Sequence, residues 1–188
     1  MKTISISVIF IFINILVYEP INCNTTLIEP PINNNLISNG SFETNNIPSL
    51  NGWRSGNKQL AKLVNEAPPG GGKWSLQLTS DWAPTTGYVY TPVSNVRSGD
   101  IVRLSAYVRT YGKFGGRGII GLSVGPEFFP NNLKSAFSSD SLWRRVSVTD
   151  TLTMTSSDTL WVVLSAPITE IVPFQQLFDL VKLEKISN

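Results

Sequence analysis

The segment 101–111 constrains the fold more than any other feature of the sequence. Apolar or small side chains occupy its even positions, which are Val102, Leu104, Ala106, Val108 and Thr110. Arg and Tyr recur at its odd positions, namely Arg103, Tyr107, Arg109 and Tyr111. Because successive side chains of a strand point to opposite faces, this alternation predicts a long strand with one apolar face and one polar, aromatic face. Such a strand must pack its apolar face against a second layer.

The rest of the sequence repeats short β-rich runs and lacks sustained helical periodicity. Glycine, proline, asparagine and aspartate separate these runs, which lie at 59–64, 75–79, 88–91, 118–124, 142–154, 159–165 and 176–186. With 101–111 and a short strand near Leu36 and Ile37, about nine strands are expected. The sequence therefore predicts an all-β, two-sheet antiparallel β-sandwich (jelly roll). The unassigned stretch 126–140 is either a functional loop or a simple connection.

The first residues read as a targeting segment. Lys2 precedes an apolar run over 4–17, which suits a secretory signal peptide and is short for a membrane span. A retained membrane anchor is the alternative. We assign 1–22 to the signal peptide, 23–35 to a polar linker and 36–188 to one domain. The protein is therefore expected to be secreted or at the cell surface, with no transmembrane segment after processing.

Cys23 is the single cysteine of the chain. It stands where a bacterial lipoprotein carries its lipidated residue, so the protein could be a lipoprotein anchored at Cys23. The preceding Pro20, Ile21 and Asn22 suit such a site poorly, which leaves simple cleavage nearby as the other interpretation. With one cysteine the chain cannot form an internal disulfide, so its core, or a metal ion, must hold it together.

Composition argues against several functions. The formal net charge is +2 and no basic run stands out, so no nucleic acid partner is expected. The absence of histidine excludes Ser-His and Cys-His nucleophilic schemes. A glycosidase needs two carboxyl groups facing each other, and no such pair can be nominated here. We expect a protein that is not an enzyme; a small glycan-active enzyme is the third and most distant alternative.

Two segments at opposite ends of the domain together resemble a known family. The first reads Leu-Ile-Ser-Asn-Gly-Ser-Phe-Glu over 36–43, followed by Gly52 and Trp53; the second reads Leu-Phe-Asp-Leu-Val-Lys-Leu over 177–183. The pair resembles the carbohydrate-binding modules of the galactose-binding-like jelly-roll superfamily that accompany xylanases and glucanases. The resemblance implies that the two segments lie side by side, and that the domain binds a polysaccharide or glycan. We expect Phe42 and Trp53 to belong to the core.

The resemblance also implies a structural calcium ion. Glu43 and Asp179 match the two carboxylate positions of the family, and backbone carbonyls around Ser38 and Gly40 would complete the oxygen shell. Leu180 stands where the family often has a second acid. The alternative is a surface carboxylate pair without metal.

A glycan site needs aromatic rings for the C–H faces of sugars and fixed polar groups for their hydroxyls. Tyr107, Arg109 and Tyr111 share one face of the 101–111 strand. In the resembling modules the ligand often crosses the concave sheet, so this strand is expected on its floor. Further aromatic residues could extend the site, with Tyr88 and Tyr90 added to the floor and Trp82 at the rim.

Other interpretations of these residues stay open. Trp143 and Trp161 either pack on the outer sheet or join the floor of the site. Tyr and Arg are also ordinary on a solvated sheet face. The leading hypothesis is non-catalytic carbohydrate binding; the alternative is a structural or adhesive cell-surface domain that makes protein contacts.

Overall fold

The computed structural model describes residues 34–80, 86–111, 116–129, 133–167 and 174–186. The predicted signal peptide, Cys23, Trp82 and the linker up to residue 33 lie outside these ranges. Residues 33–188 cluster as one compact unit. In the described part of the chain, no helix has the length and apolar character needed to cross a membrane.

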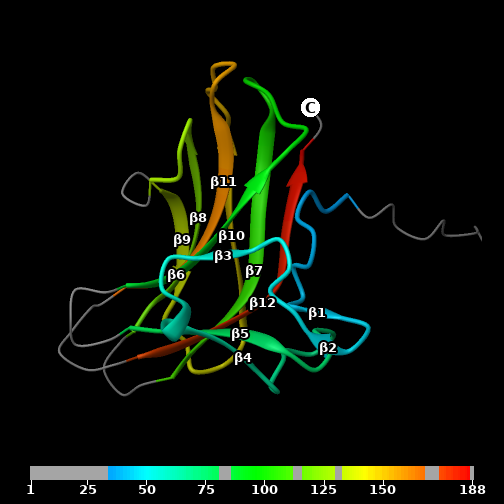
Figure 1. Ribbon diagram of the computed structural model, residues 1–188, viewed down its shortest axis with the longest axis vertical. Helices are drawn as coiled ribbons and strands as arrows, with labels where there is room; N and C mark the ends of the chain where they lie inside the picture. Colours follow the sequence, from blue (N-terminus) through cyan, green and yellow to red (C-terminus); the bar gives the residue numbers. More distant parts are fainter. Residues whose placement is uncertain (1–33, 81–85, 112–115, 130–132, 168–173, 187–188) are drawn as a thin grey trace, which may run out of the picture. The chain divides into compact units, whose positions relative to one another are not determined.

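Ten strands form two five-stranded antiparallel sheets (Figure 1). The β7–β12 sheet has the order β10 (Arg144–Thr151), β7 (Ile101–Tyr111), β12 (Gln175–Lys185), β5 (Ser75–Thr79) and β4 (Ala61–Val64). The β6–β11 sheet has the order β3 (Arg54–Ser55), β6 (Gly87–Val93), β11 (Thr159–Ala166), β8 (Gly118–Gly125) and β9 (Lys134–Ser138). A small hairpin of β1 (Glu43–Thr44) and β2 (Ile47–Pro48) precedes them. The predicted two-sheet β-sandwich is confirmed.

The core lies between the two sheets and follows the alternation of the strands. The even residues of β7 are at most 2 % exposed. On the facing sheet, Leu160, Val162 and Leu164 of β11 are fully buried. The odd residues of both strands consequently face outward, which places the side chains of β7 and of β11 on opposite outer faces of the sandwich.

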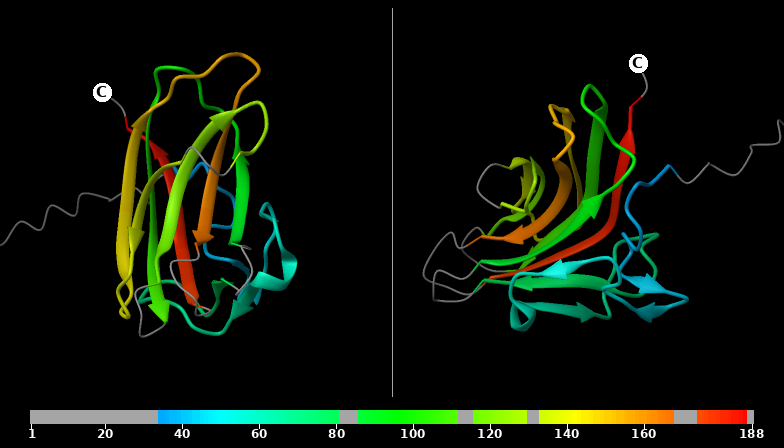
Figure 2. Two further views of the ribbon diagram at one scale, coloured as in Figure 1. Left: turned by 90° about the vertical axis from the view of Figure 1, so that its left-hand side faces the viewer. Right: turned by 45° about the horizontal axis from the view of Figure 1, so that its top comes forward.

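The sandwich is bent. In the right-hand view of Figure 2, β11 and β12 bend in the same direction, with β11 on the inner side of the bend. The outer face of the β6–β11 sheet is therefore concave, and the outer face of the β7–β12 sheet is convex. The opening segment, defined as residues 34–51, runs beside β12 (Figure 1).

Three local expectations from the sequence need correction. No strand forms near Leu36 and Ile37, because this part of the opening segment makes isolated bonds to β12 and no continuous ladder. The predicted strand 59–64 begins as a 3-10 turn, Lys58–Leu60, which the Asn57 side chain caps by accepting from Gln59 N at 3.0 Å. The unassigned stretch 126–140 contains β9, an edge strand of the β6–β11 sheet.

Candidate functional site

The opening segment and β12 are joined by hydrogen bonds. The Asn35 amide donates to Val181 O at 2.9 Å and its Oδ1 accepts from Leu183 N at 2.9 Å. Backbone bonds add Leu36 N to Leu183 O and Val181 N to Gly40 O, both at 2.8 Å. The expectation that the two ends of the domain lie side by side is confirmed.

Phe42 and Trp53 belong to the core, as the sequence predicts. Phe42 is fully buried, Trp53 is nearly so, and their ring centroids lie 5.4 Å apart. The Trp53 indole also donates to Asn39 O at 3.1 Å. These contacts pin the turn that carries Glu43 into position.

Glu43 and Asp179, here called the carboxylate pair, converge on one glycine-rich loop. A Cβ placed on Gly71 would lie 2.2 Å from Asp179 Oδ2, and one on Gly72 would lie 1.7 Å from Glu43 Oε1. The next amide, Lys73 N, donates to Glu43 Oε2 at 3.0 Å. A side chain at either position would displace a carboxylate of the pair, and Gly72 also has φ +80, a conformation that favours glycine. Sequence reasoning missed this partner, although the run of glycines at 70–72 was its signal.

Asp179 is a buried carboxyl group with an unused oxygen. Its exposed fraction is 0 %, its Oδ1 accepts from Leu180 N at 2.7 Å, and its Oδ2 has no hydrogen-bond partner. Burial raises the pKa of Asp179 to about 8, the Leu180 N–H lowers the pKa, and the negative charge of Glu43 raises it. A buried, unpaired carboxylate oxygen beside a second carboxylate is a site suited to a hard cation.

The backbone at Asp179 is bent to make this arrangement. The ladder between β12 and β7 shifts register between Asp179 and Lys182, and Leu180 has φ +50. Among the described residues, no group of three or more acidic, histidine or cysteine side chains gathers, so any further ligands would be backbone carbonyls, amide or hydroxyl side-chain oxygens, or water. Of the predicted carbonyl ligands, Gly40 O accepts from Val181 N, and both Ser38 and Gly40 line the cavity described below.

Arg109 and Tyr111 lie on the convex face and are held by Glu66. The Tyr111 hydroxyl lies 2.7 Å from each Glu66 carboxylate oxygen, and Arg109 forms an ion pair with the same carboxylate. The Arg109 guanidinium carbon lies 4.5 Å from the centroid of the Tyr111 ring, and Arg109 Nε donates to Ser141 O at 2.8 Å. Burial, and then the Glu66 hydrogen bond, raises the pKa of Tyr111. Nothing in the local sequence signalled Glu66.

Tyr107 has different surroundings from its two neighbours. It is the direct ladder partner of Arg145 on one side and of Asp179 on the other. Its ring lines a cavity together with Arg145, while Arg109 and Tyr111 do not. The predicted trio therefore divides into a Glu66-bound pair and a separate Tyr107.

Tyr88 and Tyr90 lie on β6, which belongs to the other sheet. The expectation that they add to the floor formed by β7 is wrong, because the hydrophobic core separates the two outer faces. The expectation that β7 crosses the concave sheet is also wrong, because β7 belongs to the sheet whose outer face is convex. Hydrophobic alternation identifies which side chains share a strand face, but it does not identify the sheet to which a strand belongs.

An aromatic cluster occupies the concave face. Its members are Tyr88, Tyr90, Phe128 and Trp161. Phe128 stacks on Tyr90, with centroids 4.1 Å apart and planes 10° apart, and Trp161 meets Tyr90 edge-on at 5.8 Å. Trp161 lies on the outer face of the β6–β11 sheet, as part of this cluster, and not on the face of β7.

The segment after β8 lies against this cluster. The Trp161 indole donates to Gly125 O at 3.3 Å, and Ser123 Oγ donates to Phe129 O at 3.2 Å. Trp161 is consequently only 8 % exposed, whereas Tyr88 and Tyr90 are partly exposed. Tyr88, Tyr90 and Phe128 are the partly exposed members of the aromatic cluster.

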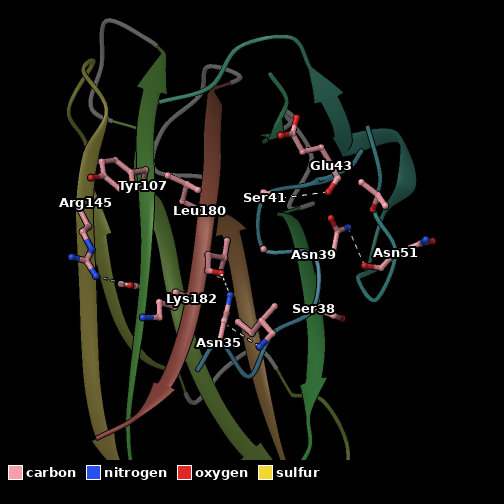
Figure 3. Close-up of a pocket in the computed structure, with 15 residues that line it drawn as sticks. Asn35, Ser38, Asn39, Ser41, Glu43, Asn51, Tyr107, Arg145, Leu180 and Lys182 are labelled. Carbon is pink, nitrogen blue, oxygen red and sulfur yellow. Dashed lines mark hydrogen bonds between the residues drawn. The ribbon is translucent and has the colours of Figure 1, made fainter. Parts of the chain in front are cut away.

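A polar cavity of about 730 Å³ lies on the convex face, between the β7–β12 sheet and the opening segment (Figure 3). Figure 3 shows Tyr107, Arg145 and Lys182 on the strands and Asn39, Ser41 and Glu43 on the opening segment. Asn39 donates to Ser49 O and Asn51 O, while its buried Oδ1 has no hydrogen-bond partner. Sequence reasoning did not find Arg145 or Lys182.

Fold and surface together define a β-sandwich of the jelly-roll type with one aromatic face and one polar cavity. No family model matches the sequence, and no curated protein matches it. Solved structures do match the fold. A family 16 carbohydrate-binding module has a TM-score of 0.59 and 20 % identity, over 79 % of this chain and 99 % of that one.

Two further structures show the range of proteins with this fold. A family 61 carbohydrate-binding module solved with β-1,4-galactotriose has a TM-score of 0.53 and 15 % identity, over 81 % of this chain and 99 % of that one. A cyclase from Fischerella sp. TAU has a TM-score of 0.56 and 14 % identity, over 78 % and 94 % of the two chains. The fold is shared with carbohydrate-binding modules, and the site must decide the function.

Proposed function

We propose that this protein is a non-catalytic carbohydrate-binding module that binds a polysaccharide on its concave face. The observation that carries the proposal is the aromatic cluster on that face, in which Tyr88, Tyr90 and Phe128 are partly exposed. Sugar rings stack their C–H faces on aromatic side chains, and tyrosine hydroxyls can bond sugar hydroxyls. Phe128, stacked on Tyr90, provides one wall beside the tyrosines. The similarity to carbohydrate-binding modules supports the proposal.

The carboxylate pair supports a second proposal, that of a structural calcium ion. Calcium prefers oxygen ligands, and Asp179 Oδ2 and the carboxylate of Glu43 are of this kind. Bound there, the ion would supply positive charge that holds both carboxylates ionised. It would tie the opening segment and the 71–73 loop to β12, a role that a disulfide serves in other exported domains. The ion would not take part in binding at the concave face.

The test compares the two surfaces on which binding was expected. The chain is titrated with a panel of plant and microbial polysaccharides, as are a Tyr88→Ala/Tyr90→Ala variant and a Tyr107→Ala/Tyr111→Ala variant. Binding to at least one neutral polysaccharide should weaken by about fivefold or more in the first variant, since an aromatic contact contributes about 1 kcal/mol. The second variant should bind that polysaccharide like the unchanged chain.

Other outcomes have definite meanings. If only the Tyr107→Ala/Tyr111→Ala variant loses affinity, the convex face is the binding site and our assignment is wrong. If no polysaccharide binds, our proposal is wrong, and the alternative of a structural or adhesive domain that contacts proteins is favoured. Release of reducing ends from any bound polysaccharide would contradict the absence of catalysis.

Export belongs to the same proposal. We propose that the segment 1–22 directs secretion, and that the module acts outside the cell or on its surface. Expression of the full chain in a bacterial host, followed by mass spectrometry of the mature N-terminus, tests both. A lipid-modified Cys23 would identify a lipoprotein, and an unmodified N-terminus near this position would identify simple cleavage.

A further inference from the structure

The polar cavity on the convex face has a chemistry different from that of the aromatic cluster. Of the described residues that line it, Tyr107 is the one aromatic side chain, and the remaining side chains are mostly amide, hydroxyl and charged groups. Its volume of about 730 Å³ lies within the range of small-ligand sites. The hydrophobic core separates it from the concave face, so it is a second and independent surface.

The strand side of the cavity carries uncompensated positive charge. Arg103 and Lys182 both pair with the single carboxylate of Glu184, with Lys182 Nζ at 2.7 Å from Glu184 Oε2. Arg145 has no carboxylate partner among the described residues. Of these three cations, Arg145 and Lys182 line the cavity, and Arg145 is the one whose charge no described carboxylate offsets. An anionic group is its natural complement.

Arg145 is held in place without being neutralised. Its Nη2 donates to Ser105 Oγ at 3.3 Å, and Ser105 is almost fully buried in the floor of the cavity. A neutral partner fixes the position of the guanidinium and leaves its other N–H groups available. An arginine presented in this way matches a carboxylate, which it can bind through two parallel hydrogen bonds.

The opposite wall suits a polyhydroxylated ligand. The opening segment contributes the Ser41 hydroxyl and the Asn51 amide, while the Asn39 amide group already donates to Ser49 O and Asn51 O. The Tyr107 hydroxyl has no hydrogen-bond partner among the described residues, and its ring is partly exposed. Hydroxyl-binding groups on one wall, and Arg145 beside Lys182 on the other, fit a ligand that has both hydroxyls and a carboxylate.

We propose that the polar cavity binds the uronic acid residues of acidic saccharides, with Arg145 and Lys182 on the sugar carboxylate and Tyr107 and the opening segment on the rest of the sugar. Glu43 is the single acidic residue in the described lining of the cavity, and its carboxylate already accepts from Lys73 N. This site is additional to polysaccharide binding at the aromatic cluster and does not depend on it.

The experiment uses matched acidic and neutral probes. Short oligomers of galacturonate, glucuronate and mannuronate are titrated calorimetrically into the full chain, each beside its fully methyl-esterified form. At least one acid should bind about tenfold more tightly than its own ester, because the ester cannot form a charged hydrogen bond. That binding should weaken as salt is added, because the cations are partly exposed. If no acid binds better than its ester, the proposal is wrong.

Variants locate the site. Arg145→Ala, and Arg145→Gln as a milder change, should lower the affinity for the acidic oligomer about tenfold. The matched control is Arg144→Ala, which removes the adjacent arginine of β10; that arginine pairs with Asp140 and does not line the cavity. An Arg145 variant that binds the acid as well as the Arg144 control overturns the proposal.

Two further arms separate this site from the other proposals. A calcium chelator should leave acid binding intact; binding that the chelator abolishes while Arg145→Ala preserves it would place the acid on an ion and overturn the assignment. The Tyr88→Ala/Tyr90→Ala variant should lose affinity for neutral polysaccharide and keep its affinity for the acidic oligomer. If this variant still binds neutral polysaccharide, the proposed function is wrong but the proposed acid site is not. If the Arg145 variants bind the acid normally, the acid site is wrong but the proposed function is not.

Discussion

At the scale of single residues, Asp179 is the most unusual group in the structure. It is a carboxyl group with no exposed surface, one oxygen without a partner, and a second carboxylate nearby. A buried ionised carboxylate with no compensation is strongly unfavourable. The buried charge can be avoided in two ways: the carboxyl group can stay protonated, or the carboxylate can bind a cation.

Protonation of Asp179 in the folded protein predicts how stability depends on pH in the absence of calcium. The pKa of Asp179 is raised in the folded protein from 3.8 to about 8. Between these values the folded state keeps a proton that the unfolded state has lost, so the free energy of unfolding falls as pH rises from about 4 to about 8. At 1.36 kcal/mol per unit of pKa, the total loss is roughly 5 kcal/mol. Chemical denaturation in a chelator at several pH values measures it.

An Asp179→Asn variant isolates this effect. The amide is neutral at every pH, so the calcium-free variant should be more stable than the unchanged protein at pH 8 and similar to it at pH 4. Calcium should raise the melting temperature of the unchanged protein, more so at pH 8 than at pH 5, and should leave the variant unmoved. Glu127→Gln, in an exposed loop, is the control and should behave like the unchanged protein. A chelator that leaves the unchanged protein's melting temperature the same at pH 8 would reject the ion.

At the scale of elements, the opening segment depends on β12 for its position. It forms only the short β1–β2 hairpin of its own, and the Asn35 side chain joins it to β12 through Val181 and Leu183. One wall of the polar cavity and one member of the carboxylate pair belong to this segment. Its attachment should therefore control both sites.

We predict that Asn35→Ala destabilises the protein by roughly 2–3 kcal/mol, because it removes three hydrogen bonds of about 1 kcal/mol each. The same variant should bind calcium and acidic saccharides more weakly, while its binding of neutral polysaccharide should stay unchanged. Asn34→Ala changes the exposed neighbour and should alter stability by less than about 0.5 kcal/mol. Equal losses in the two variants would show that Asn35 does not anchor the segment.

The sequence predicted elements well where burial alternates, and poorly where it does not. The strand 101–111 was found with its true bounds, because its even residues all enter the core. The edge strand β9 was missed, since four of its five residues stay at least partly exposed and give no alternating pattern. The pairing of the opening segment with β12 follows from a motif, whereas Gly71, Glu66 and Arg145 act through contacts with parts of the chain that are distant in sequence.

At the scale of the whole molecule, the sandwich has two outer faces with different chemistry. The concave face carries the aromatic cluster, while the convex face carries the carboxylate pair and the polar cavity. Phe178 and Leu164, from one sheet each, are fully buried in the core that fills the space between the faces. The structure shows no hydrogen bond or ion pair that would link the tyrosines of the cluster to Glu43 in the described residues.

This separation predicts that the two faces act independently. Tyr90→Ala should weaken neutral polysaccharide by about fivefold and leave the calcium-dependent rise in melting temperature unchanged. Glu43→Gln should abolish that rise and leave the polysaccharide affinity unchanged. In the double variant each effect should have the size that it has in the single variant, to within about 0.5 kcal/mol for the polysaccharide affinity, as expected for distant sites without shared partners. Calorimetric titration and thermal unfolding of the four proteins, with calcium and with a chelator, complete the cycle. A chelator that weakens neutral polysaccharide more than tenfold in the unchanged protein would mean that the ion shapes the concave face through the core.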